Sequence, residues 1–201
     1  MRILVADDHA VVRSGLKTIL GAREGWEVCA EAETADQAVA LARVYRPDVA
    51  ILDLNMPGIT GLEASAEIKK SQPEIELVIL TCHYSGPLLH AIIKTGALGF
   101  VLKSDADRDL VAAVEAVWRG EPYVSRHVDA MLRASSQTTP LFMSLAESDL
   151  LTAQERERVR LVARRCGICS NGRIEPRRFW NFPRGPGKSQ SNLVFGPSNS
   201  L

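Results

Sequence analysis

Three aspartates occupy positions from which they could act together on a phosphate group. Asp7 and Asp8 directly follow an apolar run at residues 3–6. Asp53 directly follows a second apolar run at residues 49–52. Short apolar runs of this kind are typical of parallel strands that are covered on both faces. Because the carboxyl ends of parallel strands meet at the edge where open α/β sheets bind ligands, we expect the three carboxylates to converge there.

Two further polar residues end expected strands at the same edge. Thr81 follows the run 77–80, and Lys103 follows the run 99–102. An isolated aspartate after a strand is often only a helix N-cap, so Asp7 alone would be ambiguous. Five polar groups at one sheet edge instead indicate a ligand site.

This set of groups suits phosphoryl chemistry. Clustered carboxylates repel one another unless a divalent cation compensates their charge, and oxygen ligands suit Mg²⁺. The Lys103 ammonium could neutralise an entering phosphoryl group, and the Thr81 hydroxyl could donate to one of its oxygens. A carboxylate can itself accept the phosphoryl group as an acyl phosphate. A magnesium-dependent phosphatase is an alternative, but Asn55 stands where the usual Asp-x-Asp nucleophile motif needs its second aspartate.

The elements that must position these residues alternate along the first 120 residues. Strand-like runs and amphipathic helical segments succeed each other five times, which predicts a parallel sheet wrapped by helices through right-handed crossovers. The helical patterns end at Gly96 and at Gly120 in the last two units. The expected strands are 3–6, 27–32, 49–52, 77–80 and 99–102, and the expected helices are centred on 12–20, 38–45, 62–68, 87–95 and 107–119.

Residues 1–122 resemble the receiver domain of two-component response regulators. The motifs that carry the resemblance are Val-Ala-Asp7-Asp8-His, Ile-Leu-Asp53-Leu-Asn-Met-Pro-Gly, Thr81, and Gly-Ala-Leu-Gly-Phe100-Val-Leu-Lys103. These motifs resemble those of the NarL/FixJ-like subgroup, which has LuxR-type DNA-binding output domains. The resemblance implies a flavodoxin-like (βα)5 doubly wound fold for this part of the chain.

The resemblance also implies roles for the polar residues at the sheet edge. Asp53 would receive phosphate from a histidine kinase. Mg²⁺ would be held by Asp8, by Asp53 and by the main-chain carbonyl of Asn55, with Asp7 acting nearby. The protein would then be a phosphate-accepting switch rather than an enzyme, although it could assist its own phosphorylation and dephosphorylation.

Lys103 and Thr81 would sense the phosphoryl group, again by resemblance. Phe100 takes the place of the switch aromatic whose rotamer reports on Thr81, although an aromatic at the end of a strand is also ordinary core. Ser104 follows Lys103 where many receivers have a proline. The four histidines (His9, His83, His90 and His127) are scattered without metal-site spacing, so we expect them at the surface or at the rim of the pocket.

The charge of the chain is zero in total but divided between its two parts. Residues 1–125 carry 12 basic and 18 acidic side chains, a net charge of −6, and residues 126–201 carry 12 and 6, a net charge of +6. Such an asymmetry indicates two modules with different partners. No apolar run approaches the roughly 18 residues of a membrane span, so we expect no membrane partner. Sparse cysteines and a charged N-terminus favour a cytoplasmic location.

The segment after the receiver-like part has a different composition. We expect a linker at 123–150, with a short helical piece around Val128 and Leu132 and a polar stretch at 134–140. A helix is expected at 151–165, with Thr152 as N-cap and Glu155 as its capping-box partner. This helix resembles the first helix of a LuxR-type helix-turn-helix domain, and residues 170–174 resemble the Ser-Asn-x-x-Ile sequence that follows its first turn.

The remainder of residues 151–201 departs from that family. Prolines and glycines between 176 and 188 stand where the recognition helix should be, which predicts a partly degenerate, partly disordered region. A disturbed coding frame is one hypothesis for this departure. Cys166 and Cys169 provide only half of a zinc site.

Two functions remain open at this point. The chain is either a response regulator that binds DNA to regulate transcription, or a receiver that acts through protein contacts with a non-functional tail. The tail beyond residue 150 has 10 basic and 3 acidic residues, so it could hold phosphate backbones without sequence preference. A histidine kinase is the expected partner, a homodimer is a further possibility, and no specific DNA-binding residue is assigned.

Overall fold

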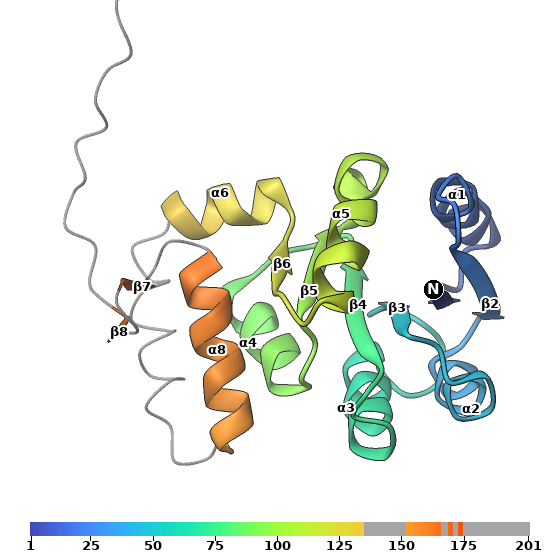
Figure 1. Cartoon of the computed structure of the whole chain (residues 1–201), viewed down its shortest axis with the longest axis horizontal. Coiled ribbons are helices and arrows are strands. Elements are labelled where there is room, and N and C mark those ends of the chain that lie inside the picture. Colours follow the sequence, from blue (N-terminus) through green and yellow to red (C-terminus); the bar gives the residue numbers. More distant parts are fainter. Residues whose placement is uncertain (135–151, 166–168, 171–172, 175–201) are drawn as a thin grey trace, which may run out of the picture.

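The computed structural model describes residues 1–134, 152–165, 169–170 and 173–174, and its centre is a six-stranded parallel sheet (Figure 1). The strand order is β2-β1-β3-β4-β5-β6. Strand β1 is followed in the chain by β2 on one side and then by β3 on its other side. The strand order therefore changes direction between β1 and β3. The strands are β1 (Arg2–Ala6), β2 (Glu27–Ala32), β3 (Val49–Asp53), β4 (Glu76–Thr81), β5 (Gly99–Leu102) and β6 (Tyr123–Val124).

Helices cover both faces of this sheet. Alternate residues of β3 point to opposite faces, so that Val49 and Ile51 join one apolar cluster while Ala50 and Leu52 join the other. Helices α1 and α5 supply the first cluster, and α2, α3 and α4 supply the second. This confirms the doubly wound, flavodoxin-like fold. The helices are α1 (Ala10–Gly21), α2 (Ala35–Tyr45), α3 (Gly61–Ser71), α4 (Gly86–Lys94) and α5 (Ala106–Trp118), the last preceded by a 3₁₀ turn, η1 (Lys103–Asp105).

Local sequence signals explain where three of the helices begin. The side chains of Thr34 and Ser85 accept hydrogen bonds from main-chain N–H groups in the first turns of α2 and α4. Thr60 and Glu63 form a reciprocal capping box at the start of α3. These caps define how each βα loop enters its helix, and the loops run along the edge of the sheet that carries the polar residues.

The segment that follows α5 differs from the expected linker. Residues 123–134 form β6 and helix α6 (Arg126–Ala134). Tyr123 N–H donates to the Leu98 carbonyl at 2.9 Å, and Ser125 N–H donates to the Phe100 carbonyl at 2.9 Å. Val128 and Leu132, expected on a short helical piece, are fully buried against the core. A two-residue strand is too short to show periodicity, which is why the expected receiver boundary at 122 falls before it.

Helix α8 (Ala153–Arg165) confirms the helix expected at 151–165 and packs beside α4 and β6 (Figure 1). Val159 and Ala163 are fully buried, and Val162 is nearly so. Val162 lines a small apolar cavity together with side chains of α4, β5 and β6, among them Phe100. The Arg165 guanidinium lies 5.8 Å from the centre of the Tyr123 ring. The receiver surface formed by α4, β5 and β6 is therefore covered by the first helix of the tail.

Little of the remaining tail falls within the described residues. Cys169–Ser170 (β7) and Arg173–Ile174 (β8) form a two-residue antiparallel ladder at the segment that resembles the Ser-Asn-x-x-Ile sequence after the first turn. The capping partner Glu155, Cys166 and the expected linker from 135 onward lie outside the described residues or side chains. None of the described helices is both long enough and apolar enough to cross a lipid bilayer.

Candidate phosphoacceptor and metal site

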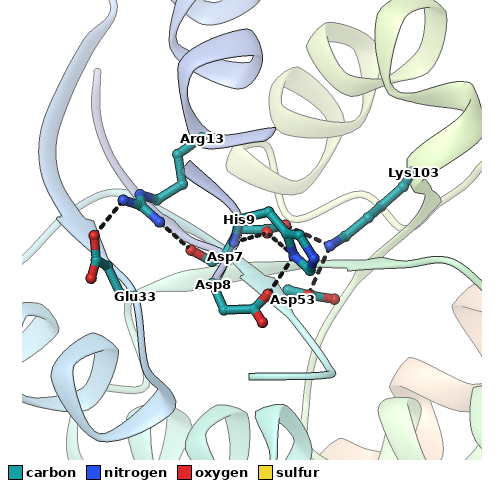
Figure 2. A network of polar contacts seen from close by, with 7 residues as sticks. All are labelled: Asp7, Asp8, His9, Arg13, Glu33, Asp53 and Lys103. Carbon is teal, nitrogen blue, oxygen red and sulfur yellow. Dashed lines mark hydrogen bonds and ion pairs between the residues drawn. The ribbon is translucent and has the colours of Figure 1, made fainter. Parts of the chain in front are cut away.

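The carboxylates at the carboxyl edge of β1 and β3 converge as the sequence predicts (Figure 2). Asp7 and Asp53 are almost completely buried, whereas Asp8 is exposed. One side-chain ligand atom from each of Asp7, Asp8, His9 and Asp53 lies within 4.8 Å of the others. His9 is the member of this group that the sequence placed at the surface or at the rim of the pocket, without a role. Its ring is exposed, but its Nδ1 atom faces the carboxylates.

Lys103 supplies the positive charge of the cluster. Its Nζ atom lies 2.7 Å from Asp7 Oδ2 and 2.8 Å from Asp53 Oδ2. Burial alone would lower the pKa of Lys103, but hydrogen bonds and charge attraction from Asp53 and Asp7 outweigh it and raise that pKa. The ammonium therefore stays protonated at neutral pH, at a point between the two buried carboxylates.

The donor set fits a divalent cation. Asp53 Oδ1 is buried and has no hydrogen-bond partner, which is a costly state for a carboxylate oxygen. Asp8, beside it, is open to solvent. A hard cation that keeps some of its water molecules would coordinate the unpartnered oxygen. It would also offset the excess negative charge of the three aspartates, which Lys103 alone does not neutralise. Asn55, the expected source of a main-chain carbonyl ligand, is exposed two residues beyond the end of β3.

The backbone after β3 brings the start of α3 close to Asp53. Gly61 opens α3, and its N–H donates to the Leu54 carbonyl at 3.2 Å. A side chain at this position would collide with the main-chain carbonyl oxygen of Asp53. Glycine is therefore required where α3 approaches the end of β3, and the loop between them stays close to Asp53.

Arg13 on α1 is a part of the network that the sequence did not single out (Figure 2). It donates one hydrogen bond to the Asp7 main-chain carbonyl at 2.8 Å and another to Glu33 at 2.6 Å. Its side chain is largely buried. Because its charge is directed at a carbonyl and at Glu33, Arg13 joins α1, the end of β1 and the end of β2 without occupying the carboxylate cluster.

Thr81 and Phe100 lie on neighbouring strands, but both side chains are engaged elsewhere. The Thr81 hydroxyl donates to the His83 carbonyl and accepts from the His83 N–H, each at 3.3 Å. Phe100 is buried and meets Tyr84 edge-on, with 6.3 Å between the ring centres. Tyr84, in the loop after β4, had no signal in the sequence beyond its aromatic character.

A second polar contact lies directly after Lys103. Asp105 faces the ring of His127 on α6 and accepts a hydrogen bond from Ser125. Burial would raise the pKa of Asp105, but these hydrogen bonds and the nearby His127 lower it below its usual range. The contact attaches α6 to the turn that carries Lys103, which adds to the evidence that residues 123–134 pack as part of this fold.

Comparison with known proteins identifies the family. The model of the response regulator receiver domain matches residues 3–115. The chain belongs to the response regulators. The oxygen regulatory protein NreC of Staphylococcus epidermidis is 39% identical to this response regulator over 172 residues, which cover 83% of this chain and 79% of that protein. The response regulator UvrY of Escherichia coli K12 is 34% identical over 157 residues, or 78% of this chain and 70% of that protein.

Solved structures are similar to the same part of this response regulator. A LuxR-family two-component response regulator from Aurantimonas is 34% identical with a TM-score of 0.63, covering 67% of this chain and 98% of that one. The receiver domain of a putative NarL from Mycobacterium tuberculosis is 29% identical with a TM-score of 0.57, covering 60% and 97%. Together with the sequence relatives, these likenesses support the NarL/FixJ-like subgroup.

Proposed function

We propose that this response regulator accepts a phosphoryl group on Asp53 from a histidine kinase and regulates transcription. The observation that carries the proposal is the environment of Asp53, which is buried at the carboxyl edge of β3, ion-paired to Lys103 and left with one unpartnered oxygen. Asp53 attacks the phosphorus of the phosphohistidine, so that the P–N bond breaks, a P–O bond forms and the imidazole leaves.

The residues around Asp53 have different roles in this transfer. Asp8, Asp53 and the main-chain carbonyl of Asn55 would hold Mg²⁺, with Asp7 close by, and the cation would neutralise charge on the phosphoryl oxygens. Lys103 orients the acceptor carboxylate and then pairs with the phosphoryl group. The receiver is thus a signalling switch, and Asp7, Asp8 and Lys103 give it the means to assist its own phosphorylation and dephosphorylation.

The signal leaves the site through Thr81 and Phe100. Once a phosphoryl group is present, the Thr81 hydroxyl exchanges its hydrogen bonds with His83 for one to a phosphoryl oxygen. Phe100, one strand away, shares an apolar cavity with Val162 of α8. A rearrangement of Phe100 therefore changes the surface on which α8 rests, and packed interfaces of this kind switch between discrete arrangements.

Incubation with acetyl phosphate and Mg²⁺ tests the acceptor. Intact-mass measurement is expected to find one added phosphoryl group on the wild-type chain and none on Asp53→Ala, because Asp53 Oδ2 pairs with Lys103 while its buried Oδ1 has neither a hydrogen bond nor an ion pair with any described residue. Omission of Mg²⁺ is the matched control and should remove the labelling. Equal labelling of Asp53→Ala, or none on the wild type, would contradict the proposal.

The output of the switch has two candidates. The likeness to LuxR-family regulators and the basic tail support DNA binding. The burial of Val159, Val162 and Ala163 against the receiver supports the second, a receiver that acts through protein contacts. An apolar stripe used in this way is not available to form the core of a helix-turn-helix domain.

Fluorescence anisotropy with a promoter duplex and a scrambled duplex distinguishes the two outputs. A transcription regulator is expected to prefer the promoter sequence by about 1,000-fold or more once phosphorylated. A non-functional tail would bind both duplexes equally and lose affinity steeply between 50 and 200 mM salt, as counterion release requires. Sequence-blind binding by both the phosphorylated and unphosphorylated chain would overturn the DNA-binding output and leave the acceptor proposal intact.

A further inference from the structure

His9 lies at the start of α1, with its side chain directed at the carboxylates. Its Nδ1 atom is 2.6 Å from Asp8 Oδ1 and 3.4 Å from Asp7 Oδ1 (Figure 2). Its main-chain N–H donates to Asp7 Oδ1 at 2.9 Å. Although His9 occupies the N-cap position of α1, its side chain makes no capping hydrogen bond. The ring is thus available to the carboxylate cluster rather than engaged by the helix.

The cluster therefore offers nitrogen as well as oxygen. Asp7, Asp8, His9 and Asp53 each place one ligand atom within 4.8 Å of the rest. The buried Asp53 Oδ1 lacks a hydrogen-bond partner, and this independently indicates that the carboxylate cluster can accept a cation. Imidazole suits the later first-row transition metals, whereas Mg²⁺ prefers oxygen and retains water. A histidine at this point changes which cation the site favours.

We propose that His9 is a side-chain ligand of the cation site and gives it a preference for Co²⁺-like transition metals over Mg²⁺. This inference rests on the proposed magnesium site and concerns the identity of its cation. The exposed position of the ring allows Nδ1 to exchange its contact with Asp8 for a metal while Asp8 becomes a ligand on the same ion. No movement of α1 is needed, because the ring does not cap it.

Calorimetric titration of the full chain with Co²⁺ and with Mg²⁺ tests the preference. The wild type is expected to bind Co²⁺ about 100-fold more tightly than Mg²⁺. His9→Gln, which keeps a polar side chain of similar length, should reduce that ratio by about tenfold and change Mg²⁺ affinity by less than about twofold. His83→Gln is the matched control, because it removes another exposed imidazole from the same sheet edge and should leave the ratio unchanged.

Proton NMR of the Co²⁺ form supplies a second readout. Strongly shifted resonances from the carbon-bound protons of one imidazole are expected in the wild type and in His83→Gln, and none in His9→Gln. Normal Mg²⁺ binding with an unchanged ratio and no shifted ring protons would overturn the role of His9 and leave the magnesium site standing. Failure of both cations to bind the wild type would instead overturn the proposed site itself.

Discussion

Replacing Lys103 with methionine is expected to lower the free energy of unfolding of the metal-free protein by about 3 kcal/mol. The ammonium lies between Asp7 and Asp53, both of which are buried. Methionine fills a similar volume, but it leaves two neighbouring carboxylates without a counter-charge. Removing one partner from a buried charge cluster costs more than removing an exposed ion pair, because the remaining charges stay desolvated. Urea denaturation in the presence of EDTA measures the difference.

A cation should compensate for the missing lysine. Saturating Mg²⁺ is expected to stabilise Lys103→Met more than the wild type, because it replaces the lost positive charge and binding to the folded state adds stability. Lys17→Met is the matched control: its ion pair with Glu31 is exposed, so the change should cost less than about 1 kcal/mol. A metal-free Lys103→Met protein as stable as the wild type would show that Asp7 and Asp53 do not depend on the ammonium.

Replacing Val162 with aspartate is expected to detach α8 from the receiver. Val162 lies in the apolar cavity bounded by α4, β5 and β6, and no described positive group lines that cavity. Burying an unpaired carboxylate there would cost several kcal/mol, which exceeds what the two remaining buried apolar side chains of the helix, Val159 and Ala163, can offset. Amide hydrogen exchange in residues 153–165 should then accelerate by about 100-fold or more, while exchange in β1, β3 and β4 stays slow.

Two comparisons show whether the effect comes from docking. Glu157→Asp places an aspartate on the exposed face of α8 and should leave amide exchange in this helix nearly unchanged. If phosphorylation and docking are coupled through Phe100, Val162→Asp should also change the equilibrium affinity of the Asp53 site for a phosphoryl analogue, because coupling of binding free energies between two sites is reciprocal. Unchanged exchange in α8 would mean that the helix does not depend on this cavity.

The inner strands could be predicted from sequence because each is a short, nearly continuous apolar run. The positions of the runs at 3–6, 49–52, 77–80 and 99–102 agree with β1, β3, β4 and β5 to within two residues at each end. Topology then requires the residues after these strands to share one edge, so the convergence of Asp7, Asp8, Asp53 and Lys103 followed from the fold class alone. The chemistry proposed for Asp53 remains a prediction.

Side-chain direction could not be predicted in the same way. His9 follows Asp8 in the chain, yet whether its ring faces solvent or the carboxylates depends on the backbone at the start of α1. Arg13 contacts Glu33, and Tyr84 contacts Phe100. Both partners are distant in the sequence, so no local pattern indicated these contacts. The docking of α8 on β6 could not be predicted either, because the two-residue strand β6 has no periodic pattern of its own.

The short strand β6 also has a consequence for how this fold avoids association with itself. Without residues 123–125, the carbonyls of Leu98 and Phe100 would lie unpaired along β5, an apolar strand at the edge of the sheet. An open apolar edge of this kind is a template for pairing with the same edge of another molecule. Two residues of β6, held by α6 behind them, end the sheet with a strand too short to recruit a neighbour. The segment between the receiver motifs and the tail thus protects the β5 side of the sheet from edge-to-edge aggregation.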